Sequence, residues 1–196
     1  MVAATLLAVP AASAGFLDGL TQLALPTCGP TQHPFAEFGD DAAYYALPNN
    51  GFESGSAGWA LSGGARIVAD NEPWFVNGDG VAALALPPGS SATSPAVCIN
   101  LFDPHFRMFA RSVAADRNLR VQIIFRGVTG NLTGVLNLRS FDPGDYAGWQ
   151  PSDRVPSLLA LPVLTVSAQV KLTSLASSGT WRVDDVFVDP WVNRIG

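Results

Sequence analysis

The sequence has little charge and a single lysine. Charged residues make up 14% of its 196 residues, and among the eleven basic residues only Lys171 is a lysine. Acidic residues outnumber basic ones by 16 to 11, which gives a formal net charge of −5. A chain without a basic excess cannot neutralise a phosphate backbone, so we expect no binding to nucleic acid.

Long apolar runs are also scarce. Residues 2–12 form a short apolar run that cannot span a bilayer, and Ala12-Ser13-Ala14 follows it with the small residues of a cleavage site. This pattern predicts a signal peptide over 1–14, with a buried N-terminal helix as the alternative. We therefore expect a secreted or cell-surface protein that does not insert into the membrane.

Only two cysteines occur, Cys28 and Cys98. Two cysteines in an exported protein usually pair, so we predict a disulfide bond between them. The alternative is two separate buried thiols.

Residues with the spacing of known catalytic sites are missing. The two histidines, His33 and His105, belong to no His-Glu-x-x-His pattern, and there is no Gly-x-Ser-x-Gly turn. Glycosidases need two carboxylates, and Asp142 and Asp145 flank Pro143-Gly144. Aspartates around Pro-Gly are typical turn formers, however. We expect no enzyme, and a polysaccharide lyase or hydrolase is the less favoured alternative.

Glycine and proline, by contrast, are plentiful, with 19 and 15 residues spread along the chain. Such breakers indicate many short strands joined by turns rather than long helices. The apolar runs between them predict strands at 58–62, 65–69, 81–86, 91–94, 96–100, 106–113, 119–126, 132–139, 165–173 and 180–188. About ten antiparallel strands in one chain of this size imply two packed sheets.

The clearest alternation lies in residues 119–126 and 166–172. Leu119, Val121, Ile123 and Phe125 share one face of the first segment, which is the pattern of a strand that packs on a core from one side. The sequence thus predicts an all-β, antiparallel two-sheet β-sandwich over 42–196. An irregular segment over 15–41, held by Cys28, precedes it.

Two short motifs stand at opposite ends of this predicted sandwich. Near its start is Asn50-Gly51-Phe52-Glu53, followed by Gly58-Trp59, and its last strand contains Trp181-Arg182-Val183-Asp184-Asp185-Val186. Together they resemble the calcium-bearing, galactose-binding-like jelly rolls of carbohydrate-binding modules. The resemblance implies a structural Ca²⁺ with Glu53 and Asp184 as side-chain ligands, and Asp185 as a less favoured substitute.

The position of Asp184 in its strand also supports a cation site. It shares parity with Val186 and Val188, which predicts a carboxylate on an apolar face. A buried carboxylate needs a partner, and Ca²⁺ accepts carboxylate oxygens alongside backbone carbonyls. The alternative is that Glu53 lies in a solvated turn and that Asp184 accepts ordinary hydrogen bonds.

Sugar-binding modules use exposed aromatic rings together with polar side chains that bond the hydroxyl groups. Trp74, Tyr146 and Trp149 lie in predicted loops, with Arg126 and Gln150 as polar partners. These five residues form the predicted ligand site, although large aromatic residues are often packed instead. Trp59 and Trp181 are predicted to belong to the core.

These observations favour a secreted, non-catalytic module that binds a glycan or cell-wall polysaccharide. The alternative from another class is a structural or adhesive surface protein that contacts a protein partner. An exposed apolar patch without a polar groove would favour that alternative.

Overall fold

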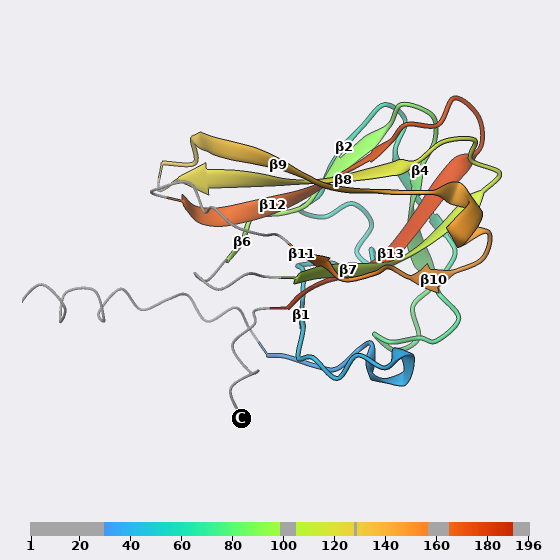
Figure 1. Ribbon diagram of the computed structural model, residues 1–196, viewed down its shortest axis with the longest axis horizontal. Helices are drawn as coiled ribbons and strands as arrows, with labels where there is room; N and C mark the ends of the chain where they lie inside the picture. Colours follow the sequence, from blue (N-terminus) through green and yellow to red (C-terminus); the bar gives the residue numbers. More distant parts are fainter. Residues whose placement is uncertain (1–29, 99–104, 128, 157–164, 190–196) are drawn as a thin grey trace, which may run out of the picture.

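The protein folds as two antiparallel β-sheets packed face to face (Figure 1). The computed structural model describes residues 30–98, 105–127, 129–156 and 165–189. The sheet here called the β13 sheet contains, in spatial order, β10 (Gln150–Pro151), β7 (His105–Val113), β13 (Thr180–Asp189), β4 (Ala82–Leu86) and β3 (Arg66–Ala69). Two short strands extend it, since β1 (Tyr45–Ala46) pairs with β13 and β11 (Val155–Pro156) pairs with β7.

The second sheet, here called the β12 sheet, contains the strands β2 (Ala60–Ser62), β5 (Ser91–Thr93), β12 (Thr165–Ser174), β8 (Leu119–Gly127) and β9 (Leu132–Phe141) in that order. A further strand, β6 (Val97–Cys98), pairs with β12. Within the described residues helical structure is limited to two short 3₁₀ turns, η1 (Ala36–Phe38) and η2 (Pro143–Tyr146), and no helix there is long and apolar enough to cross a membrane.

The all-β sandwich predicted from the sequence is confirmed. Each of the predicted strands corresponds to an observed strand with ends shifted by one or two residues, where the structure describes them. The short strands β1, β10 and β11 were not predicted, because two residues carry no detectable periodicity. The signal peptide over 1–14 and Cys28 lie outside the described residues, so export and the Cys28–Cys98 bond stay predictions.

The main core lies between the two sheets. Leu119, Val121, Ile123 and Phe125 of β8 all point into it, as their alternation predicts. The two tryptophans expected in the core are also there: the Trp59 Nε1 donates to the Pro48 carbonyl at 3.2 Å and the Trp181 Nε1 to the Arg117 carbonyl at 2.9 Å. Both indoles thus bury their rings while their N–H groups stay bonded.

Strand β13 contains a β-bulge that changes which residues face the core. Val183 faces the core before the bulge and Val186 after it, so the parity of the strand reverses between Asp184 and Phe187. Asp185 lies in the bulge with a left-handed φ of 48°. Asp184 pairs with the outward-facing Phe109, so its side chain lies on the outer face of the sheet. The prediction that Asp184 shares a face with Val186 is therefore wrong, whereas the prediction of a buried carboxylate on an apolar face is confirmed, because Asp184 is buried beside Phe109 on the outer face.

Two segments, residues 30–44 and 70–80, cover the outer face of the β13 sheet. Phe35 and Tyr44 of the first segment pack against Phe109 and Phe187 in a second, smaller aromatic cluster. Figure 1 shows the first segment running beneath β7 and β13, on the side away from the β12 sheet. Asp184 is buried by this cover and not by the core.

Asp40 fixes the first covering segment to the sheet. Its buried carboxylate accepts bonds from Arg107 (2.7 Å), from the Tyr44 hydroxyl (2.6 Å) and from Arg154. Burial alone would disfavour the charged form, but the bonds from Arg154, Tyr44 and Arg107 hold the pKa of Asp40 well below its usual range. The ion pair thus stays charged throughout the neutral pH range.

We expect Asp40→Asn to lower the free energy of unfolding by about 3 kcal/mol, because a neutral amide leaves the largely buried Arg107 without its counter-charge. Urea denaturation would measure the loss. Asp153→Asn is the matched control, since the Arg139–Asp153 pair is exposed and its loss should cost less than about 1 kcal/mol. Equal effects of the two substitutions would contradict this role of Asp40.

Candidate functional site

The first and last parts of the sandwich meet beside two aspartates. Strand β1 pairs with β13, and the Val186 N–H donates to the Asn50 carbonyl at 3.4 Å. The backbone next to Gly51 faces both aspartates, because a Cβ added to this glycine would lie 2.8 Å from Asp185 Oδ1 and 3.8 Å from Asp184 Oδ1. Both carboxylates therefore converge on the backbone of the Asn50-Gly51-Phe52-Glu53 turn at Gly51.

Asn49 shapes that turn. It adopts a left-handed φ of 53°, and its side chain bonds the Gly55 carbonyl at 2.9 Å and the Ser54 N–H at 3.0 Å. The Phe52 side chain is fully buried against Trp59. An asparagine suits this position because it tolerates left-handed backbone and bonds nearby peptide groups.

Glu53 is exposed and reaches toward the start of β4. Its Oε1 accepts bonds from the N–H groups of Val81 (2.9 Å) and Ala82 (3.0 Å). Its negative charge also contributes to raising the pKa of Asp185, so Glu53 lies within electrostatic range of the aspartates. The structure thus brings Glu53 into the same region as Asp184 and Asp185, while its carboxylate bonds the N–H groups of Val81 and Ala82, and its role as a metal ligand stays a prediction.

Glu72 is an acidic residue of this region that sequence reasoning missed. Its fully buried carboxylate accepts bonds from the N–H groups of Trp74 and Val76, at 2.5 and 2.7 Å, and its own N–H donates to Asp184 Oδ2 at 3.2 Å. The local sequence, a glutamate followed by a proline, does not indicate that Glu72 is buried beside Asp184, because the two residues are 112 positions apart in the chain.

The acidic region has no basic partner in the described part of the chain, where Arg107, Arg111, Arg154 and Arg182 form their ion pairs with Asp40 and Asp70 instead. Burial and then the charge of Asp185 raise the pKa of Asp184 to about 9. Burial and the charges of Glu72 and Glu53 raise the pKa of Asp185 to about 7, although the 2.5 Å bond from Asn77 opposes the rise. The region therefore holds protons or attracts a cation.

The donor set suits a hard cation with oxygen ligands. Among the described residues, no three acidic, histidine or cysteine side chains converge as a complete ligand set, so carbonyl or amide oxygens would have to complete one. Asn50 lies beside the aspartates with its buried amide nitrogen unpaired in the structure.

The five residues predicted to bind ligand lie in three different places. Trp74 and Trp149 both pack on the aromatic cluster outside the β13 sheet. The Trp74 ring lies 4.9 Å from the Phe38 ring and 5.3 Å from the Phe109 ring, and the Arg111 guanidinium lies 5.4 Å from the centre of the Trp149 ring. Both rings are half-buried, and their inner faces pack against these neighbouring side chains.

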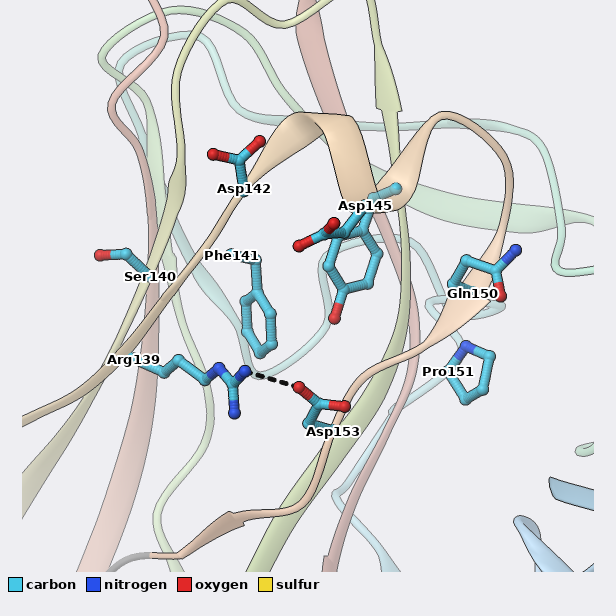
Figure 2. Close-up of a pocket in the computed structure, with 9 residues that line it drawn as sticks. Arg139, Ser140, Phe141, Asp142, Asp145, Gln150, Pro151 and Asp153 are labelled. Carbon is cyan, nitrogen blue, oxygen red and sulfur yellow. Dashed lines mark ion pairs between the residues drawn. The ribbon is translucent and has the colours of Figure 1, made fainter. Parts of the chain in front are cut away.

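Tyr146 and Gln150 line an open hollow of about 280 Å³ between the end of β9 and β10 (Figure 2). Figure 2 also shows the Arg139–Asp153 ion pair, which borders this hollow; its nitrogen and oxygen lie 2.6 Å apart. Tyr146 is only 5% exposed because its ring packs between Phe141 and Trp181. It therefore offers no ring face to a sugar, contrary to the expectation of an exposed aromatic.

Asp142 and Asp145 also border the hollow, but they act as turn formers. The Asp142 carboxylate accepts the Gly144 N–H at 2.8 Å and caps η2. His33 is likewise engaged locally, with its Nδ1 donating to the Asp41 carbonyl at 2.9 Å. The turn interpretation of these aspartates is therefore confirmed.

Arg126 lies on the outer face of the β12 sheet, which no described segment covers (Figure 1). Its Nε donates to Gln169 Oε1 at 2.9 Å, and Gln122 donates to Asn137 Oδ1 at 2.7 Å on the same face. The outward side chains of the three long strands are Arg120, Gln122, Ile124 and Arg126 of β8, Ser167, Gln169, Lys171 and Thr173 of β12, and Leu132, Val135, Asn137 and Ser140 of β9. In the sequence, polar residues alternate with the core residues of these strands. This alternation could have identified the outer face as a candidate binding surface.

The comparisons with known proteins support the fold. No family model and no curated protein matches the sequence. The xylan-binding CBM22-1 domain of Paenibacillus barcinonensis Xyn10C is 14% identical, with a TM-score of 0.51 over 71% of this chain and 90% of that domain. The CBM22-1–GH10 modules of Clostridium thermocellum xylanase 10B, complexed with xylohexaose, are 12% identical, with a TM-score of 0.51 over 74% of this chain and 28% of theirs.

A third match is the enzymatically active domain of the bacteriophage CBA120 tailspike protein 4, which is 12% identical, with a TM-score of 0.50 over 73% of this chain and 21% of that one. Two of these three structures are parts of enzymes, and this chain corresponds to only about a quarter of each. The chain therefore has the jelly-roll fold of carbohydrate-binding modules, as the resemblance of its two terminal motifs implies.

The raised pKa values of Asp184 and Asp185 predict how the free energy of unfolding depends on pH when a chelator removes divalent cations. Unfolded aspartates lose their protons near pH 4, whereas folded Asp184 and Asp185 keep theirs up to about pH 9 and pH 7. Between these limits the folded chain binds more protons, so the free energy of unfolding should fall as the pH rises from 5 to 9. Urea denaturation at several pH values would measure this slope.

Asp185→Asn serves as the control, because the amide keeps an acceptor for Asn77 without the charge. This variant should show a flatter slope and gain about 1 kcal/mol or more at pH 9. A wild-type stability that stays constant or rises from pH 5 to 9 in chelator would contradict the assignment.

Proposed function

We propose that this protein is an exported, non-catalytic glycan-binding module whose ligand lies on the outer face of the β12 sheet. The observation that carries this proposal is the uncovered row of amide, hydroxyl and cationic side chains on β8, β9 and β12. Gln122, Asn137 and Gln169 supply donors and acceptors that match sugar hydroxyl groups.

This face fits an extended polymer better than the hollow does. Strands β8, β9 and β12 run for nine or ten residues each, so the face is about 30 Å long. The hollow of about 280 Å³ is smaller than an extended polymer needs, and the exposed Arg139–Asp153 pair lines part of it. The likeness in fold to a xylan-binding domain agrees with a glycan ligand.

A contact surface for a protein partner is the second candidate considered, and no specific observation favours it. Of the exposed large apolar residues, Leu132 and Val135 share strand β9, whereas Phe75, Val81 and Val113 lie in other parts of the chain. They do not supply the single patch that a protein interface would need.

We also propose that Ca²⁺ binds the acidic region and stabilises the fold. Asp184, Asp185 and Glu53 would supply carboxylate oxygens, and peptide carbonyls near Asn50 would complete the set. A divalent cation would replace the protons that the aspartates otherwise retain, and it would fasten the Asn50-Gly51-Phe52-Glu53 turn to β13.

The glycan site is tested by electrophoresis through gels that contain soluble polysaccharides, which measures retention of the folded protein. We expect the double variant Gln122→Ala/Asn137→Ala to lose most of its retention with an unchanged thermal midpoint. The matched control, Gln150→Ala, removes an exposed amide at the hollow and should have no effect. Loss of retention in the control alone would move the site to the hollow and contradict the proposal.

The calcium proposal predicts a higher thermal midpoint after Ca²⁺ addition. A ligand at one hundred times its dissociation constant adds about 2.7 kcal/mol, which corresponds to a rise of roughly 5 to 10 °C for a chain of this size. Differential scanning calorimetry with chelator, with Ca²⁺ and with Mg²⁺ would measure it. An unchanged midpoint in Ca²⁺, or an equal rise in the Asp184→Asn variant, would argue against the site.

A further inference from the structure

The charges of the protein are divided unequally between its two sheets. The strands of the β12 sheet contain four basic residues, Arg120, Arg126, Arg139 and Lys171, and not one aspartate or glutamate. The whole chain nevertheless carries a net charge of −5. Three of the four, Arg120, Arg126 and Lys171, lie on the outer face of this sheet, which is therefore a basic surface on an acidic protein.

Most arginines elsewhere in the structure have counter-charges. Arg107 and Arg154 pair with Asp40, Arg111 and Arg182 pair with Asp70, and Arg139 pairs with Asp153 at the edge of the β12 sheet. Arg120 and Lys171, by contrast, have no ion-pair partner in the described part of the chain. Their positive charges are uncompensated by the protein.

These two cations lie close together. Arg120 pairs in register with Thr173, and Lys171 pairs with Gln122, so Arg120 and Lys171 are diagonal neighbours on one face, with their Cβ atoms roughly 7 Å apart. Arg126 lies about 13 Å further along β8 from Gln122, and Gln169 holds its guanidinium in place. The amides of Gln122 and Asn137 lie beside these cations.

We propose that the glycan bound by this face is a polysaccharide that carries carboxylate groups, that is, a uronan. This inference rests on the proposed glycan-binding function and names its substrate class. The Arg120 guanidinium can bond a carboxylate through two parallel N–H groups, Lys171 adds a point charge, and the amides bond the hydroxyl groups of the same sugar units.

The surface does not suit a nucleic acid, although that is also a polyanion. Binding of single strands needs aromatic rings on which bases stack. The described aromatic residues of the β12 sheet, Phe125 and Phe141, are buried and belong to the core. Hydrogen-bonding amides beside separate cations match a chain of acidic sugars instead.

The test measures the affinity of the full chain for polygalacturonate and alginate, each beside its carboxyl-reduced form, and for neutral xylan and single-stranded DNA. Calcium is fixed at a low concentration that does not gel the polymers. We expect one or both uronans to bind, with affinity reduced about ten-fold or more by carboxyl reduction and by the double variant Arg120→Gln/Lys171→Gln. Added salt should also weaken this binding.

Two variants control for folding and for charge in general. Arg66→Gln removes an exposed arginine from β3 of the other sheet and should leave the affinity unchanged. Lys171→Arg keeps the positive charge and should retain binding, whereas a loss in both controls would overturn the assignment to this face.

The outcomes separate the two proposals. Equal binding of uronans and their carboxyl-reduced forms, insensitive to Arg120→Gln/Lys171→Gln, overturns the uronan inference and leaves the glycan-binding function standing. Binding of DNA with the same dependence on Arg120 and Lys171 overturns the inference as well, since charge alone would then explain it. Binding of no polysaccharide overturns both proposals.

Discussion

The pairing of strand β13, the last strand, with strands from the first part and the middle of the chain is the constraint on which the remaining structure depends. β13 pairs with β7 and β4, and at its far end it also pairs with β1. The bulge at Asp185 lets this strand serve two purposes, because Val183 and Val186 both face the core while Asp184 turns outward. Without the bulge, Val183 and Val186 would point to opposite faces of the sheet, because successive side chains of a regular strand alternate.

The outer faces of the two sheets differ, because described segments cover the face of the β13 sheet and none covers that of the β12 sheet. The β13 sheet carries aromatic and acidic side chains outward and is covered by residues 30–44 and 70–80, which are fixed through Asp40 and Asp70. The β12 sheet carries amides and cations outward with no described cover. Charge compensation is thus concentrated where segments pack on a sheet, and the uncompensated cations lie where a ligand has access.

The positions of the strands along the chain and the faces that they bury could be predicted from the sequence because both depend on local patterns, whereas the order of the strands in the two sheets was not predicted. Alternation in 119–126 identifies a strand and its buried face, and glycine and proline mark the turns between strands. The ligand site was harder to predict, because aromatic residues in loops, such as Tyr146 and Trp149, look the same in sequence whether they are packed or exposed. Their burial depends on contacts with residues far away in the chain, such as Trp181 and Arg111.

By itself the sequence determined an all-β sandwich, its strands, and the meeting of its two terminal motifs. The tertiary structure decided which carboxylates are buried together, since Glu72 and Asp184 are 112 residues apart. It also decided which sheet face is covered and which is open. The physical reason is that hydrophobic periodicity is a property of neighbouring residues, whereas burial of a charge depends on whatever distant segment packs over it.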